Sequence, residues 1–168
     1  MINKWNFQTP SEEELHKRDQ LVAELGFSPV ICLLLVQRGI TSIEEAKKFF
    51  KPSLNDLHDP FLMPDMDKAV RRLNKALGNK EKILIYGDYD VDGTTAVSLV
   101  FKYLRPYSST LDFYIPDRYD EGYGISYKGI DYAAENGVSL VISLDCGIKA
   151  IEKIEYAKEK GIDFIICD

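Results

Sequence analysis

The sequence contains the stretch Ile83-Leu-Ile-Tyr-Gly-Asp-Tyr-Asp-Val-Asp-Gly93, in which an unbroken apolar run is followed by three alternating aspartates. A short apolar run that ends at glycine predicts a strand buried on both faces. Gly93-Thr94-Thr95 then leads into a segment of helical length and period near residues 94–105. The stretch therefore predicts a buried strand that turns tightly into a helix.

Three more apolar runs follow farther along the chain, with helical segments near residues 126–136 and 148–160 between them. These runs are Leu111–Ile115, Leu140–Leu144 and Phe164–Cys167. Repeated alternation of strand and helix predicts an α/β fold with a parallel sheet, right-handed crossovers and helices on both faces. We expect all four runs to lie parallel in one sheet.

The first part of the chain has a different, helical pattern. Capping residues, prolines and glycines delimit four predicted helices, which span about Ser11–Gly26, Ser28–Gly39, Thr41–Pro52 and Asp65–Gly78. We therefore expect two regions, an amino-terminal helical region at 1–78 that caps the sheet and the first part of an α/β domain at 79–168.

Composition limits the classes of protein that fit. The chain is 45% hydrophobic and 29% charged, as expected of a globular protein, and its net charge of −6 argues weakly against a nucleic-acid partner. Its longest apolar run, Val30–Val36, is too short to cross a membrane, and the first residues lack a signal peptide. The three cysteines have no metal-ligand spacing, so we interpret them as reduced, buried thiols of a cytoplasmic protein.

Each predicted strand is followed by an aspartate. These residues are Asp88, Asp90 and Asp92 after the first strand, Asp117 beside Arg118 after the second, Asp145 after the third and Asp168 after the fourth. Ligands of open parallel sheets bind beyond the carboxyl ends of the strands. We therefore expect the aspartates to converge on one crevice.

The three alternating acids predict a cation site. In an extended segment their side chains would point to the same side, about 6.6 Å apart. Each neighbouring pair would then repel by roughly 2–3 kcal/mol at an effective dielectric near 20. Such repulsion is tolerated when a hard cation such as Mg²⁺ or Mn²⁺ neutralises it. The amino end of the next helix is also suited to a phosphate.

Simpler interpretations exist for each of these residues. Asp92 and Asp145 are each suited to cap the helix that follows. Asp117 and Arg118 are suited to a surface ion pair, which would contribute little to stability. The basic residues of the fourth predicted helix are best interpreted as a solvated face, with phosphate contact as the alternative; they are Lys68, Arg71, Arg72 and Lys75.

Several segments resemble the DHH phosphoesterase superfamily, and specifically its RecJ branch. Ile85–Thr95 resembles the first motif, Ile115–Gly124 resembles the "PxRxxEGYG" element with an additional Asp120 before the glutamate, and Leu144–Ile148 resembles the second acidic motif. Ile165–Asp168 resembles the approach to the Asp-His-His motif. Matches in the helical region, at Gln37–Ile40, Glu44–Phe50 and Asp59–Met63, extend the resemblance over nearly the whole chain.

The resemblance implies roles for six residues. Asp88, Asp90, Asp92 and Asp145 would be metal ligands, Arg118 would contact the substrate, and Asp168, which resembles the Asp of Asp-His-His, would be a catalytic residue that orients the ligands. The family implies Mn²⁺ or Mg²⁺, two ions in the full-length protein, and hydrolysis of single-stranded DNA in repair and recombination. The two histidines of the motif would follow Asp168, so we expect residues 1–168 alone to be inactive.

Other functions fit parts of the same pattern. Asp90-Val-Asp-Gly-Thr-Thr95 also fits the "DxDGT" motif of haloacid-dehalogenase-type phosphatases, but Gly87-Asp88-Tyr89 separates it from the strand. A phosphate-loop nucleotidase fits less well, because no Gly-Lys-Ser/Thr follows the glycine. A DHH phosphodiesterase acting on small oligonucleotides or cyclic dinucleotides remains open, as does a module that only binds nucleic acid or a partner protein.

Overall fold

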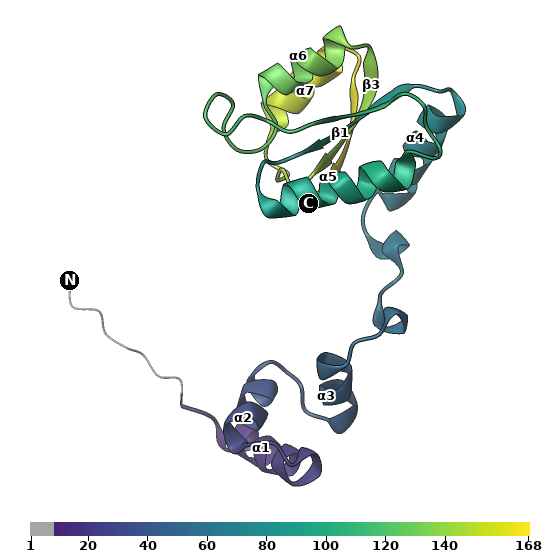
Figure 1. The fold of residues 1–168 in the computed structure, drawn as a ribbon. Helices are drawn as coiled ribbons and strands as arrows, with labels where there is room; N and C mark the ends of the chain where they lie inside the picture. The colour runs from purple at the N-terminus through teal and green to yellow at the C-terminus, as the bar shows by residue number, and fades with distance from the viewer. Residues whose placement is uncertain (1–8) are drawn as a thin grey trace, which may run out of the picture. The chain divides into compact units, whose positions relative to one another are not determined.

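The computed structural model describes residues 9–168 and divides into two compact units, the first ending at Pro60 and the second spanning Phe61–Asp168 (Figure 1). The sequence predicts the division at residue 78. The helix before that position lies instead in the unit that contains the sheet. The expected packing of the earlier helices on the sheet stays a prediction.

The first unit consists of three α-helices, α1 (Glu12–Leu25), α2 (Pro29–Gln37) and α3 (Ile43–Phe50). Each begins with a serine whose hydroxyl accepts a main-chain N–H from the first turn. Their small shared core consists of Leu21, Cys32, Leu35, Val36 and Ala46. Two short 3₁₀ helices, η1 (Leu54–Asp56) and η2 (Pro60–Leu62), follow α3.

The second unit contains the predicted parallel sheet. Its strands are β1 (Lys82–Gly87), β2 (Leu111–Tyr114), β3 (Val138–Leu144) and β4 (Asp163–Cys167), and its helices are α4 (Met66–Gly78), α5 (Val91–Leu104), α6 (Tyr127–Glu135) and α7 (Ile151–Glu159). The strand order is β2-β1-β3-β4, and every neighbouring pair is parallel. The predicted fold class is confirmed.

Alternate residues of β1 pack against helices on opposite faces of the sheet (Figure 1). Ile83 and Ile85 share a core with Val97 of α5. Leu84 and Tyr86 share the other core, which includes residues from both α6 and α7. Because both faces of β1 and β3 are covered, these strands show continuous apolar runs.

The strand order creates a switch point between β1 and β3. From β1 the chain passes through α5 on one face to β2, whereas from β3 it passes through α7 on the other face to β4. The connections that leave the carboxyl ends of β1 and β3 therefore diverge. A crevice for ligands forms at such a position in open α/β sheets.

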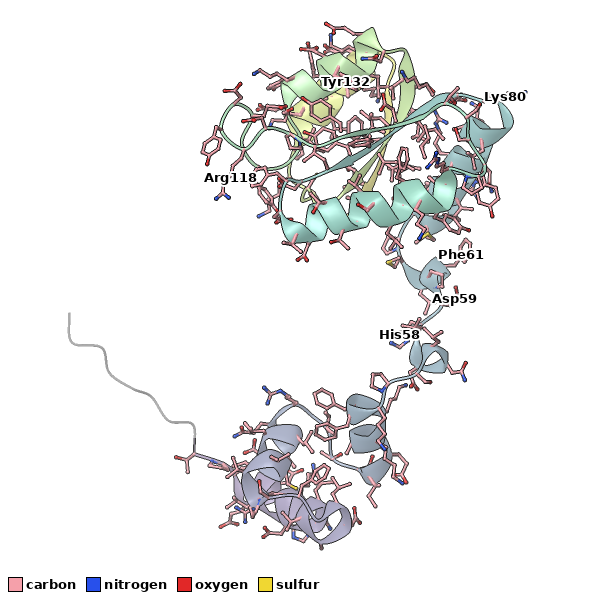
Figure 2. The ribbon with its side chains drawn as sticks, viewed as in Figure 1. His58, Asp59, Phe61, Lys80, Arg118 and Tyr132 are labelled. Atoms are coloured by element: carbon pink, nitrogen blue, oxygen red, sulfur yellow. The ribbon has the colours of Figure 1, made fainter. Side chains whose placement is uncertain are left out.

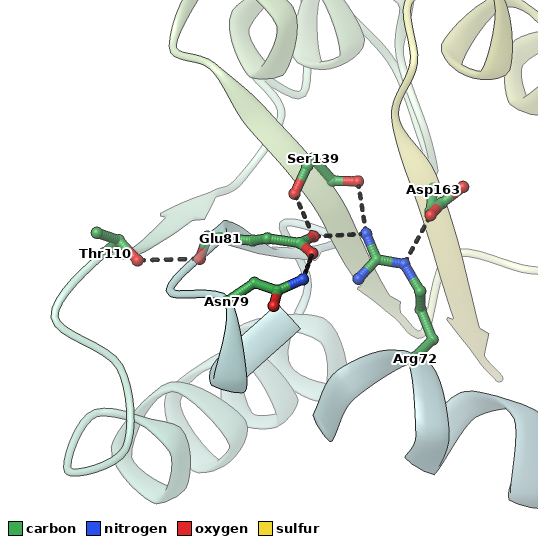
Figure 3. Close-up of polar contacts among 6 residues, drawn as sticks. All are labelled: Arg72, Asn79, Glu81, Thr110, Ser139 and Asp163. Carbon is green, nitrogen blue, oxygen red and sulfur yellow. Dashed lines mark hydrogen bonds and ion pairs between the residues drawn. The ribbon is translucent and has the colours of Figure 1, made fainter. Parts of the chain in front are cut away.

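Arg72 joins α4 to the opposite, amino edge of the sheet (Figure 3). Its Nε donates to Asp163 Oδ2 over 2.6 Å, and its Nη2 donates to Glu81 Oε2 over 2.8 Å and to the carbonyl of Ser139 over 3.3 Å. The Ser139 hydroxyl also donates to Glu81 Oε2, over 2.7 Å. Arg72 is therefore not part of a solvated face, because it links α4 to acids beside β1 and on β4.

Two further observations concern the composition of the chain. Cys32 and Cys146 are buried as expected, but Cys167 is exposed because it ends β4, whose outer edge is uncovered in this sheet. All three thiols are free. Within residues 9–168, no helix has both the length and the apolar character needed to cross a membrane.

Candidate functional site

Asp88 follows β1 directly and has a fully buried carboxylate. Its Oδ1 accepts the N–H of Tyr89 over 2.6 Å, and its Oδ2 accepts the N–H of Gly124 over 3.0 Å. Gly124 belongs to the loop that follows β2. Asp88 therefore fastens that loop to the end of β1, and both of its oxygens are already hydrogen-bonded to main chain.

Asp90 caps α5, with its Oδ1 accepting the N–H of Gly93 over 2.9 Å. Asp92 lies in the first turn of that helix. The capping role considered above for Asp92 thus belongs to Asp90. The expected extended stretch also ends at Asp90, because α5 begins at Val91.

Gly93 allows α5 to begin this close to β1. A Cβ at this position would lie 2.6 Å from the main-chain nitrogen of Asp88 and 2.8 Å from its carbonyl carbon, which is closer than Cβ atoms approach other atoms in proteins. The glycine is thus required by the close approach of two main-chain segments. This contact holds the two aspartates of the α5 amino end beside the end of β1.

Asp145 follows β3 and has a left-handed backbone conformation, with a φ of 57°. Its N–H donates to the carbonyl of Cys167 over 3.0 Å, which joins the ends of β3 and β4. Asp145 does not cap the next helix, because α7 begins only at Ile151 after the N-cap residue Ala150. Asp168, which follows β4, also contacts the loop after β3, since its Oδ1 accepts the N–H of Gly147 over 3.0 Å.

The acids that follow β1, β3 and β4 influence one another electrostatically. Burial raises the pKa of the Asp145 carboxyl group, and so do the negative charges of Asp90, Asp92, Asp168 and Asp88. Effects of this kind come from charges that lie nearby. The carboxyl group of Asp145 thus lies near the acids that follow β1 and β4.

The loop after β2 is organised by Glu121, to which the sequence analysis assigns no role. Its carboxylate accepts the hydroxyl of Tyr114 over 2.9 Å, the N–H of Asp117 over 2.8 Å and the hydroxyl of Ser126. Although burial opposes it, these hydrogen bonds hold the pKa of Glu121 below its usual value. The loop therefore has a defined shape.

Arg118 lies on this loop (Figure 2), and its guanidinium carbon is 5.3 Å from the ring centroid of Tyr89. That ring in turn meets the ring of Tyr123 edge to face at 5.9 Å. The hydroxyl of Tyr123 is 3.4 Å from the carbonyl of Asp145. Within residues 9–168, Arg118 forms no ion pair with Asp117, whose carboxylate accepts the N–H groups of Tyr119 and Asp120 instead.

Tyr89, Tyr123 and Gly124 thus belong to the site, although sequence reasoning gave them no role. All three lie inside the quoted motifs, and only their long-range contacts distinguish them. Tyr89 and Tyr123 connect Arg118 to Asp145 through adjoining rings. Gly124 supplies the N–H that holds Asp88.

The chemistry of the donor set fits a hard divalent cation, since the acids at this edge offer carboxylate oxygens that repel one another. The arrangement is not a complete metal-binding site. In the part of the chain that the structure describes, no three histidine, cysteine, aspartate or glutamate side chains are so placed that they could hold a metal ion. Binding would require carboxylates to turn or further ligands to join them.

Comparison with known proteins identifies the protein family. The model of the DHH family, N-terminal domain, matches residues 82–168, which is just over half of the chain. The chain therefore belongs to the DHH family.

Individual relatives extend the similarity beyond this domain. The single-stranded-DNA-specific exonuclease RecJ of Bacillus subtilis is 40% identical over 165 residues, which are 98% of this chain and 21% of that protein. RecJ of Escherichia coli is 31% identical over 157 residues, covering 92% of this chain and 26% of that protein. The chain thus spans about a quarter or less of the length of these two relatives.

Two solved structures of RecJ proteins are similar to this chain. RecJ from Thermus thermophilus in complex with Mn²⁺ has a TM-score of 0.67 over 92% of this chain and 21% of that chain, with 23% identity, which supports the fold alone. An exonuclease RecJ bound to manganese has a TM-score of 0.54 and 29% identity over 59% of this chain and 26% of that chain.

Proposed function

We propose that this chain forms part of a metal-dependent exonuclease that hydrolyses single-stranded DNA. The observation that carries the proposal is the raised pKa of Asp145, which follows β3; its causes are burial and the charges of acids that follow two other strands, β1 and β4. The similarity to RecJ proteins, 40% identical in one case, supports the same reaction and substrate. The Mn²⁺ in the related RecJ structures supports a divalent cation.

The proposed ligands are Asp90, Asp92 and Asp145, which follow β1 and β3 and of which the first two contribute to the raised pKa of the third. Asp88 was among the expected ligands, but its buried position and its two main-chain hydrogen bonds favour a positioning role. Asp168 is proposed to orient neighbouring groups, as it does with the N–H of Gly147. When bound, Mn²⁺ or Mg²⁺ would lower the pKa of a water molecule and stabilise negative charge on the scissile phosphate.

Arg118 is proposed to contact the substrate phosphate. Its guanidinium lies over the ring of Tyr89 and forms no ion pair with residues 9–168, so its hydrogen-bond donors are available. The amino end of α5 adds a favourable electrostatic environment for an anion beside the same acids. These residues would bind and orient the strand.

The experiment uses a chimera in which this chain replaces the matched segment of the Bacillus subtilis relative. Nucleotide release from end-labelled single-stranded DNA is measured with Mn²⁺. We expect cleavage by the chimera, no cleavage by residues 1–168 alone, and loss of cleavage in the Asp90→Ala and Asp145→Ala chimeras. Asp67→Ala, an exposed aspartate of α4, is the matched control and should remain active. An active Asp90→Ala chimera would contradict the proposed site.

A further inference from the structure

The first unit has an aromatic surface that its own core does not require. Phe27, Phe49 and Phe50 are 39%, 53% and 48% exposed, although phenylalanine is normally buried. The ring of Phe50 meets Phe27 edge to face at 5.5 Å and Phe49 at 5.3 Å. The three rings therefore support one another in a fixed arrangement at the surface.

A pocket of about 420 Å³ lies beside these rings. It is formed between the end of α1 and α3, and Leu25, Phe27, Ala46 and Phe50 supply its apolar lining. Its volume falls in the range of ligand pockets, roughly 300–1,000 Å³. The pocket is thus large enough to accept a flat ring system against an aromatic wall.

The rim of this pocket is positively charged. Lys47, Lys48 and Lys51 line it, and the single acid among its lining residues is Asp56. Asp56 pairs with Lys48 at 3.6 Å. Among the described residues Lys47 and Lys51 form no ion pair, so two ammonium groups stand free beside the exposed rings.

The other acids of α3 do not neutralise this rim. Glu44 and Glu45 lie in the first turn, at the opposite end of the helix. Glu45 is occupied there by the N–H groups of Thr41 and Ser42, at 2.7 and 3.1 Å. The cationic end of α3 thus differs in charge from the strongly acidic chain as a whole.

We propose that this surface, formed by Phe27, Phe49, Phe50, Lys47 and Lys51, binds single-stranded DNA outside the catalytic crevice. Exposed aromatic rings that stack on bases, combined with cations that contact the phosphates, are the usual elements of single-strand recognition. Double-stranded DNA hides its bases, so it gains only the phosphate contacts. The inference rests on the proposed function for its choice of ligand, because the surface would hold a strand of the same substrate.

The test measures binding of a fluorescent oligothymidylate to residues 1–168 by anisotropy, with EDTA present so that no metal site contributes. We expect Lys47→Gln/Lys51→Gln to weaken binding at least fivefold at low salt. For this double variant, the magnitude of the slope of log affinity against log salt concentration should decrease by about 1.4, since each lost phosphate contact of a single strand contributes about 0.7. Phe50→Ala should weaken binding roughly tenfold with little change in slope.

The matched control is Lys102→Gln/Lys158→Gln, which removes two exposed lysines of the second unit that form no ion pair in residues 9–168. It should bind like the wild type. Circular dichroism establishes folding, and the exposed Lys47 and Lys51 side chains make their double variant the decisive one should Phe50→Ala unfold α3. An unchanged affinity of that variant, equal binding of duplex and single strand, or self-association through the phenylalanines in sedimentation would each overturn the inference.

Failure of this inference is distinguishable from failure of the proposed function. Binding in EDTA does not depend on Asp90, so Asp90→Ala should retain oligothymidylate binding by residues 1–168 while it abolishes cleavage in the chimera. Loss of the binding surface alone would leave cleavage of short substrates intact. An active Asp90→Ala chimera would contradict the proposed function and leave the binding result unaffected.

Discussion

The main-chain N–H of Gly124 donates to the buried Oδ2 of Asp88 over 3.0 Å, although the two residues are 36 positions apart. The other oxygen of the same carboxylate accepts the N–H of Tyr89 over 2.6 Å. One side chain thus fixes both the turn after β1 and the loop after β2. The first acid of the motif therefore acts on the site through the main chain of its neighbours.

Asp88→Ala should destabilise the protein even without any metal. The substitution leaves the buried N–H of Gly124 and the partly buried N–H of Tyr89 without acceptors, and a buried unsatisfied group costs about 1–3 kcal/mol. We expect the free energy of unfolding to fall by roughly 2–4 kcal/mol in urea denaturation. Asp67→Ala on the surface of α4 should have little effect. Equal stabilities of the two variants would show that the buried hydrogen bonds contribute nothing.

Asp145→Asn should stabilise the metal-free protein, in contrast to Asp88→Ala. Burial and four neighbouring acids raise the pKa of Asp145, so the metal-free folded state is less stable when this group is charged than when it is neutral. Asparagine removes the charge and tolerates the left-handed conformation of this position. We expect the free energy of unfolding to rise slightly, because removing the charge removes the repulsion, and interactions between partly exposed charges are weak.

This effect of Asp145→Asn should be largest near pH 7 and should shrink as the pH falls. A raised folded pKa means that the folded state binds the proton more tightly, so the penalty of the wild type is present above the folded pKa and disappears below the unfolded value near 3.8. Thermal denaturation in EDTA at pH 7 and pH 4 measures this. A lower Tm for Asp145→Asn at pH 7 would contradict the repulsion.

Gly93→Ala should disrupt the junction of β1 and α5. The new Cβ would lie 2.6 Å from the main-chain nitrogen of Asp88, so either the helix or the strand end must move. Overpacking of this kind costs about 1–3 kcal/mol, and here main chain must shift, so we expect at least the upper value. Urea denaturation provides the measurement.

Gly78→Ala is the matched control for Gly93→Ala. Gly78 ends α4, and nothing lies within 4 Å of the position that its Cβ would take. Alanine should therefore stabilise the protein by about 0.5–1 kcal/mol through its helix propensity. A stabilised Gly93→Ala variant would show that the close approach to Asp88 is not a constraint.

The fold could be predicted from the sequence because its signals are local. A buried parallel strand needs an unbroken apolar run, and the runs that contain Ile83 and Leu140 predict such strands directly. Serine caps such as Ser11 and Ser42 likewise delimit helices within a few residues. The influence of the acids after β1 on the pKa of Asp145 agrees with one general property of parallel sheets, whose carboxyl ends meet at one edge.

The details of the site could not be predicted because they depend on distant contacts. The role of Asp88 is set by Gly124, and that of Tyr123 is set by contacts with Tyr89 and Asp145. The same holds for Arg72, whose neighbours on its own helix suggested a solvated surface. Its partners are Glu81, just before β1, and Asp163, the first residue of β4, and no local pattern indicates that pairing.

The hydrogen bonds around Glu81 predict that the stability of the fold decreases in acid, independently of the aspartates at the candidate metal site. Hydrogen bonds from Ser139 and then from Arg72 lower the pKa of Glu81 from 4.5 to about 2. A lowered folded pKa stabilises the folded state fully above the unfolded value, and this stabilisation is lost as the pH falls toward about 2. The contribution of Glu81 should therefore disappear between about pH 4.5 and pH 2.

Glu81→Gln isolates this contribution, because glutamine keeps the shape of the side chain and cannot carry the charge that pairs with Arg72. At pH 7 we expect the variant to be less stable by about 1.5 kcal/mol, the lower end of the range for hydrogen bonds to charged groups, since the network lies near the surface. The difference between variant and wild type should narrow steadily as urea denaturation is repeated from pH 5 to pH 2.5. Glu13→Gln, which removes an exposed partner of Lys17, is the control and should change stability little at any pH. A difference between Glu81→Gln and wild type that stays constant down to pH 2.5 would mean that the charge of Glu81 does not hold α4 against the sheet.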